Sequence, residues 1–140
     1  MFIPKKVKFR KWHTARKNAD YWLRPETRGL KLSFGSFGLK TLGHARIRSN
    51  QLESARKVIS RSLTKSGKMW VRVFPDRPYT EKPAEVKMGK GKGEPQGFCV
   101  EVRPGRMIFE VDGIPEVEAA EALRKAGSKL PVKTKFVSRA

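Results

Sequence analysis

The chain has 140 residues, of which 32 are Lys or Arg and 13 are Asp or Glu, so its net charge is +19. Charge of one sign at this density destabilises an isolated compact domain, which indicates a polyanionic partner, most commonly nucleic acid. The single cysteine, Cys99, excludes an internal disulfide and a cysteine-based zinc site, and its apolar neighbours favour a small core residue. No apolar run resembles a membrane span or a signal peptide, so we expect neither a membrane partner nor secretion.

Residues 1–31 combine cations with aromatic rings. They hold ten Lys or Arg, two acids and five aromatic residues, a local charge of +8. Such a segment buries little apolar area by itself. Rings stack on exposed bases while cations bind phosphates, so the pattern favours RNA binding. A disordered basic tail is the alternative, and we expect that tail also to order on a polyanion.

Residues 32–74 begin with a glycine-aromatic run at 33–38, which predicts a turn or irregular strand. A helix follows, capped by Ser49 or Asn50, and Glu53 completes a capping box if Asn50 is the cap. Its apolar face is spaced at helical intervals, and Ser66-Gly67 ends it. That face consists of Leu52, Ala55, Ile59 and Leu63.

The other faces of this helix carry cations without balancing acids. Three of them, Arg56, Lys57 and Arg61, are candidate phosphate contacts. A merely solvated charged face is the ordinary alternative.

Four strands and a second helix are expected in the rest of the chain. The strands cover 69–74, 98–102, 107–111 and 132–138, and a tight turn at 103–106 predicts a hairpin between the second and third. The helix runs from Pro115 to Leu130, with acids near its start and cations near its end, as the helix dipole favours. Because the acids gather on this helix and the hairpin, we expect these elements to face solvent.

Residues 75–97 contain four prolines and few apolar residues, and a loop of this length is uncommon unless it is functional or disordered. Within it, Met88-Gly89-Lys90-Gly91-Lys92-Gly93 places glycine at every second position, which excludes a packed strand or helix. Such a backbone can approach a phosphate backbone closely, with ammonium groups on either side. A flexible solvated loop is the alternative.

The predicted fold is α+β, a compact single domain over 1–140 with an antiparallel or mixed sheet and two helices. The basic extension 1–31 and a projecting loop at 75–97 complete it. Enzyme chemistry fits poorly. The Gly-Lys run is neither a Walker A loop nor a dinucleotide fingerprint, and His13 and His44 have no metal-ligand partner at a familiar spacing. We therefore expect no catalysis, metal, cofactor or small-molecule substrate.

Five segments together resemble one known family. They are 1–11, the glycine-aromatic segment 34–40, the run 70–78, the Gly-Lys run 87–93 and the close 129–137. In order and spacing they are similar to large-subunit ribosomal protein sixteen, of the bacterial and organellar type. The resemblance covers nearly the whole chain.

The resemblance implies a structural constituent of the large ribosomal subunit that binds rRNA near the A site. It also implies A-site and P-site tRNA and neighbouring ribosomal proteins as partners, and a cytoplasmic ribosome, with an organellar ribosome as the alternative. The candidate rRNA-binding residues, from the basic pattern and the resemblance together, are Lys5, Lys6, Lys8, Arg10, Lys11, His13, Arg16, Lys17, Arg56, Lys57 and Arg61. The candidate tRNA-side residues, within the family's loop at 79–97, are Lys82, Lys87, Met88, Gly89, Lys90, Gly91, Lys92 and Gly93.

Two features depart from the family. Lys87 stands where the family usually has arginine, which keeps the charge but loses the planar bidentate fork. Segment 14–32 is longer than usual. A free-standing RNA-binding regulator or assembly factor is the alternative function, because the same electrostatics would serve it.

The charge of residues 1–31 leads to a prediction about the free protein. Without RNA, we expect fast amide exchange through residue 31, because the segment is highly charged and lacks apolar periodicity. Hydrogen–deuterium exchange followed by mass spectrometry measures this. Strong protection throughout the segment in RNA-free protein would contradict the prediction.

Overall fold

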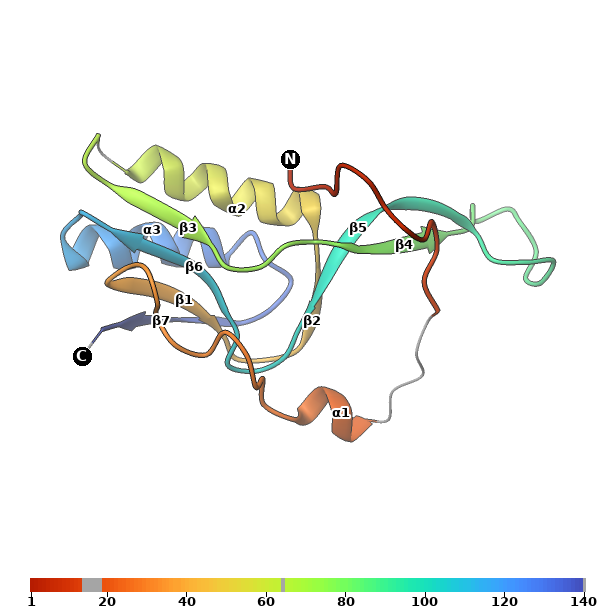
Figure 1. Ribbon diagram of the computed structural model, residues 1–140, viewed down its shortest axis with the longest axis horizontal. Coiled ribbons are helices and arrows are strands. Elements are labelled where there is room, and N and C mark those ends of the chain that lie inside the picture. Colours follow the sequence, from red (N-terminus) through yellow and green to blue (C-terminus); the bar gives the residue numbers. More distant parts are fainter. Residues whose placement is uncertain (14–18, 64, 140) are drawn as a thin grey trace.

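The computed structural model describes residues 1–13, 19–63 and 65–139, which form an α+β fold of antiparallel sheets and helices (Figure 1). One sheet has the order β3-β6-β1-β7, and the other has the order β2-β5-β4. The strands of the first are β3 (Lys68–Val71), β6 (Met107–Asp112), β1 (Phe37–Thr41) and β7 (Thr134–Ser138). Those of the second are β2 (Ala45–Arg48), β5 (Glu94–Val102) and β4 (Arg77–Glu81).

Helix α2 (Ser49–Ser62) confirms the first expected helix, and Leu52, Ala55 and Ile59 are fully buried on its core face. The expected cap was wrong. Arg48 occupies the N-cap position, and its backbone N–H donates to Gln51 Oε1 at 2.9 Å. The helix also ends earlier than expected, with Leu63 at the C-cap.

Helix α3 (Glu116–Gly127) confirms the second expected helix, with Glu116 and Glu118 in its first turn and Arg124 and Lys125 in its last. It packs against α2 and against the four-stranded sheet, and the main core lies between these layers (Figure 1). A short helix, α1 (Ala19–Leu23), adds to the two that were expected.

The predicted hairpin of β5 and β6 was wrong, because the two strands belong to different sheets. The tight turn between them exists, and the Arg106 N–H donates to the Arg103 carbonyl at 3.3 Å. However, the fully buried Thr41 binds this turn from the end of β1. Its Oγ1 donates to the Arg103 carbonyl at 2.8 Å and accepts the Arg106 N–H at 3.0 Å. The turn therefore passes the chain from one sheet to the other.

The predicted loop at 75–97 is partly strand, because β4 (Arg77–Glu81) lies within it and β5 begins at Glu94. β4 pairs with the first half of β5, and these strands form an arm that projects from the body of the protein (Figure 1). Pro78 lies in β4, an edge strand of its sheet, where the missing N–H is tolerated. Only residues 82–93, which we call the Gly-Lys loop, connect the two strands.

Glu110 corrects the expectation that the hairpin acids face solvent, because its side chain is fully buried in β6. Its carboxylate accepts N–H groups from Ser33, Phe34 and Gly35 at 2.7–3.0 Å. It also pairs with the Arg72 guanidinium at 2.6 Å. Burial alone would raise the pKa of Glu110, but these four donors outweigh it and hold the pKa below its ordinary value.

Gly35 allows the glycine-aromatic segment to lie close against the backbone of β6. A Cβ at this position would lie 2.6 Å from the Val111 carbonyl oxygen, so any side chain would push the segment off β6 and away from Glu110. Cys99 is buried in β5 as expected, and burial raises the pKa of its thiol.

The buried Glu110–Arg72 pair predicts a stability effect that depends on pH. Replacing Glu110 by Gln leaves a guanidinium without its charge partner, so we expect a loss of about 3 kcal/mol in unfolding free energy at neutral pH. Because the native pKa is lowered, the stabilisation is complete above the ordinary carboxyl pKa and is lost as pH falls through that value toward the native one.

Urea unfolding over a series of acidic pH values measures both effects. The gap between wild type and E110Q should close as pH falls, while E118Q, on the exposed surface of α3, should stay within about 0.5 kcal/mol of wild type. If the difference in unfolding free energy between wild type and E110Q stayed constant with pH, the charge of Glu110 would not be the source of its stabilising effect.

Candidate nucleic-acid interface

The N-terminal residues 1–13 run beside β4 and β5 (Figure 1). Phe2 packs against the hydrophobic core and anchors the start of the segment. Further along, Arg10 pairs with Glu94 at 2.6 Å, and Arg77 Nη2 donates to the His13 carbonyl at 3.2 Å. The two regions that the sequence assigned separately to rRNA and tRNA are therefore neighbours at the base of the Gly-Lys loop.

The candidate rRNA contacts of this segment mostly face solvent. Lys5, Lys6, Lys8, Arg10 and His13 are exposed, and Lys11 is half-buried. Arg16 and Lys17 lie outside the described residues. Exposed ammonium and guanidinium groups along one extended stretch can neutralise successive phosphates of an RNA backbone.

Direct contacts join this segment to the Gly-Lys loop. The Lys11 ammonium donates to the Lys92 carbonyl at 3.4 Å, and the Lys92 ammonium donates to the Trp12 carbonyl. Lys92 is exposed but thus engaged with the protein itself, whereas the structure describes no such contact for the exposed Lys87 and Lys90. Only the last two can offer their ammonium groups to a ligand without breaking a contact of this kind.

The tip of the Gly-Lys loop has a left-handed backbone over three successive residues, with φ of 94° at Gly89, 58° at Lys90 and 98° at Gly91. Glycine adopts this region without cost, but lysine does so at some strain. The sequence of the tip, with glycine on both sides of Lys90, therefore favours this particular backbone conformation. A Cβ at Gly91 would meet no atom within 4 Å, so glycine is required there by the backbone and not by crowding.

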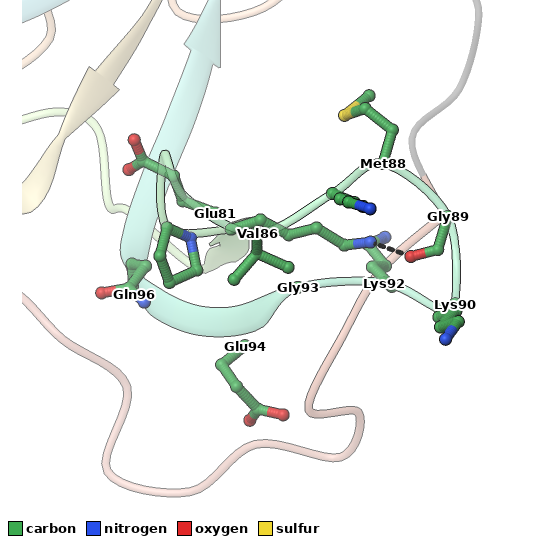
Figure 2. A pocket seen from close by; sticks show the side chains of 13 residues that line it. Glu81, Val86, Met88, Gly89, Lys90, Lys92, Gly93, Glu94 and Gln96 are labelled. Atoms are coloured by element: carbon green, nitrogen blue, oxygen red, sulfur yellow. Dashed lines mark hydrogen bonds between the residues drawn. The ribbon is translucent and has the colours of Figure 1, made fainter.

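A hollow of about 530 Å³ lies inside the loop, lined by residues of 81–94 and by Gln96. Figure 2 shows the hydrogen bond that closes it, from the Lys82 ammonium to the Gly89 carbonyl at 2.5 Å. Met88 is 94% exposed at the rim, and Gly93 is half-buried against the backbone of Glu81. The loop therefore offers an apolar tip beside cations.

The helix cations do not join this cluster, because α2 extends away from the arm (Figure 1). Arg56 pairs with Glu53 at 2.6 Å, and this hydrogen bond holds the pKa of Glu53 below its ordinary value. Lys57 and Arg61 are exposed. The helix thus presents two accessible cations, on a separate surface.

Residues of β2 and β4 add cations that the candidate set omitted. Arg46, Arg48 and Arg77 lie on the β2-β5-β4 sheet next to Tyr79 and Glu101. The alternation Ala45-Arg46-Ile47-Arg48 is the signal that predicts such a half-buried strand, with arginines on one face.

The aromatics of the long segment 14–32 turn inward. The Trp22 ring lies 5.4 Å from that of His44, and the Arg103 guanidinium lies 5.0 Å from the Tyr21 ring centroid. Arg103 also pairs with Glu26 at 3.0 Å. Residues 21–26 therefore contact the turn between the two sheets.

The described residues provide neither a helix suited to span a membrane nor a cluster suited to bind a metal ion. Residues 1–13, 19–63 and 65–139 contain no helix of the length and hydropathy that a membrane span requires. The same ranges contain no group of three or more His, Cys, Asp or Glu side chains placed to hold a metal ion.

Comparison with known proteins gives one consistent result. The family model described as ribosomal protein L16p/L10e matches residues 4–137. Proteins named "Large ribosomal subunit protein uL16" are similar over 99% of this chain. Those of Parabacteroides distasonis and Azobacteroides pseudotrichonymphae are 51% and 52% identical, with 93% and 94% of their lengths covered. That of Xanthomonas oryzae is 48% identical, with 98% of its length covered.

Proposed function

Because this chain belongs to the ribosomal protein L16p/L10e family, we propose that it is a structural constituent of the large ribosomal subunit. In this proposal it binds large-subunit rRNA near the A site and faces A-site and P-site tRNA with the Gly-Lys loop. It acts by positioning RNA and performs no chemistry. Its place is the ribosome of the cytoplasm, with an organellar ribosome as the alternative.

The observation that carries the tRNA assignment is the conformation of the Gly-Lys loop. The loop stands at the end of a two-stranded arm, and its tip combines three left-handed residues with the exposed Lys87, Met88 and Lys90. The paired strands hold this tip away from the core, where it can reach a partner. The close approach of an uncrowded backbone suits a phosphate backbone better than a protein surface.

The rRNA assignment is supported by the exposed cations of residues 1–13 and by the excess of positive charge over the whole chain. Lys57 and Arg61 on α2 provide a second basic surface. A protein that contacts RNA on several sides is suited to assembly within a particle. In this proposal, neighbouring ribosomal proteins are also partners, because assembly within the particle places them next to this protein.

Cosedimentation tests the assembly assignment. Tagged protein expressed in cells should remain with large subunits, at one copy each, after a high-salt wash. Loss of the protein in the wash would instead indicate a free-standing RNA-binding regulator or assembly factor.

The exposed N-terminal cations predict a steep dependence of rRNA binding on salt. Each phosphate contact should add about 0.7 to 0.9 to the slope of log affinity against log salt, because bound counterions are released. Neutralising Lys5, Lys6, Lys8, Arg10 and Lys11 together should flatten the slope for deproteinised large-subunit rRNA. An unchanged slope would move the contacts to other surfaces, such as α2.

The loop conformation predicts a defect in function without a defect in folding. Lys90 is exposed and Gly91 is uncrowded, so K90A and G91V should both fold and enter the large subunit. K90A removes a cation from the tip, and G91V imposes a β-branched side chain where φ is 98°. Both should slow tRNA accommodation at the A site, measured on reconstituted subunits with matched occupancy.

K92A can be compared with K90A, because it removes both a cation of the loop and the contact with the Trp12 carbonyl. K129A, which removes an exposed cation beyond α3, is the control and should leave accommodation unchanged. Normal rates for K90A and G91V at full occupancy would mean that the loop is only a tether.

A further inference from the structure

The solvent side of the β2-β5-β4 sheet carries an organised group of side chains that the proposed function does not yet use. Strand register places Arg46 opposite Glu101, and Arg48 and Arg77 on either side of Cys99. Tyr79 is opposite Gly97, two residues further along both strands. Residues two apart share one face of a strand, so these side chains form one surface, which we call the arginine face.

The arginine face has more cations than carboxylates. Glu101 lies between two of the arginines, 3.2 Å from Arg46 Nη2 and 3.4 Å from Arg77 Nε. Among the described residues, no carboxylate lies within ion-pair distance of Arg48. Glu101 therefore pairs with two of the three guanidinium groups, and Arg48 has no carboxylate partner among the described residues.

The Arg48 guanidinium lies on a layered support. A Cβ at Gly97 would be 3.0 Å from Tyr79 Oη and 3.1 Å from its Cε1, so the ring of Tyr79 lies directly on the Gly97 backbone. The Arg48 guanidinium carbon is 4.9 Å from the centroid of that ring. Cation–π stacking orients the planar guanidinium and leaves its N–H edges free to point outward, because the Arg48 side chain is exposed.

A hollow of about 300 Å³ adjoins this stack. Its lining residues are Arg46, Arg48, Tyr79, Thr80, Glu81 and Cys99. Two arginines and one exposed carboxylate, Glu81, line this hollow, so cations outnumber carboxylates and favour an anion there. At the other end of the face, the Trp12 ring covers the Arg77 guanidinium, whose carbon lies 5.7 Å from the ring centroid. A ligand therefore reaches the face from the side of Arg46 and Arg48.

We propose that the arginine face is a separate phosphate-binding site for a single RNA strand, with the stacked Arg48 as the bidentate donor and Arg46 as the second cation. The inference rests on the proposed RNA-binding function and extends it to a surface outside the N-terminal segment, the Gly-Lys loop and α2. Stacked arginine presents a planar fork that matches phosphate, which a lysine at the same place cannot. Tyr79 is a positioning residue, because it acts through the orientation of Arg48.

The test is binding of a fluorescent oligouridylate of about twelve nucleotides, a length within single-strand site sizes, followed by anisotropy over a series of salt concentrations. R48A should weaken binding at least about fivefold and lower the salt slope by about 0.7, one single-strand phosphate contact. R48K should keep the slope but lose affinity, because it keeps the charge without the fork. Y79L should behave like R48K.

K129A is the matched control, since it removes one exposed cation that lies outside the β2-β5-β4 sheet. Thermal unfolding of each variant should match wild type, which separates lost binding from lost structure. Equal effects of R48A and K129A, or wild-type affinity in R48K, would overturn the proposal. The proposal would also be overturned if R48A bound labelled polyglutamate more weakly than wild type does but bound RNA equally well. That result would indicate that the partner of the arginine face is an acidic protein segment.

The design separates this inference from the function on which it rests. If wild-type protein fails to bind either oligouridylate or deproteinised rRNA, RNA binding itself is wrong. If wild type binds with a steep salt slope and R48A matches K129A, only the arginine face is wrong.

Discussion

The carboxylate of Glu110 joins three parts of the chain that are distant in sequence. It lies in β6, accepts N–H groups from Ser33, Phe34 and Gly35, and pairs with Arg72 just after β3. The first contact fixes where the chain enters β1, and the second fixes where it leaves β3 toward the arm. Three strands of the four-stranded sheet therefore depend on one charge held by four donors. A buried carboxylate is tolerable only with such complete pairing.

Thr41 has the corresponding role between the two sheets. Its hydroxyl and backbone bind the turn at 103–106, so β5 and β6 separate and enter different sheets. One sheet then provides the core with α2 and α3. The other carries the arm, the arginine face and the neighbouring N-terminal segment. Most of the proposed RNA-binding surfaces therefore lie on the second sheet and beside it, although its Ile47 and Val102 also pack into the core.

Local patterns in the sequence predicted what depends on local physics. The helical spacing of Leu52, Ala55 and Ile59 predicted the buried face of α2, and the charge order of α3 predicted its ends. The family could be named from motifs alone. The pairing of β5 could not, because a tight turn looks the same whether or not its flanking strands pair, and the deciding contact comes from Thr41.

Two other features were hidden for comparable reasons. The prolines on both sides of the Gly-Lys run led to the prediction of a loop where β4 and the first half of β5 lie. A proline argues against a central strand, but an edge strand tolerates it. Glu110 looked like a surface acid because its partners come from other segments. For the interface, the cations of residues 1–13 and the loop were predictable from composition. The stack of Arg48 on Tyr79 was not, because it needs the cross-strand register.

The continuity of β5 constrains how this protein can vary in length. A single strand of nine residues runs from the arm to the core, with arginine partners on one side and buried Val102 on the other. Because side chains alternate, inserting one residue in β5 would exchange the two sides over the whole strand beyond it. Evolution can therefore lengthen or shorten the stem freely only in steps of two residues, unless a bulge absorbs the odd one. The stem already holds one such irregularity, where the pairing shifts register between Tyr79 and Thr80, whereas the Gly-Lys loop can change by any number of residues.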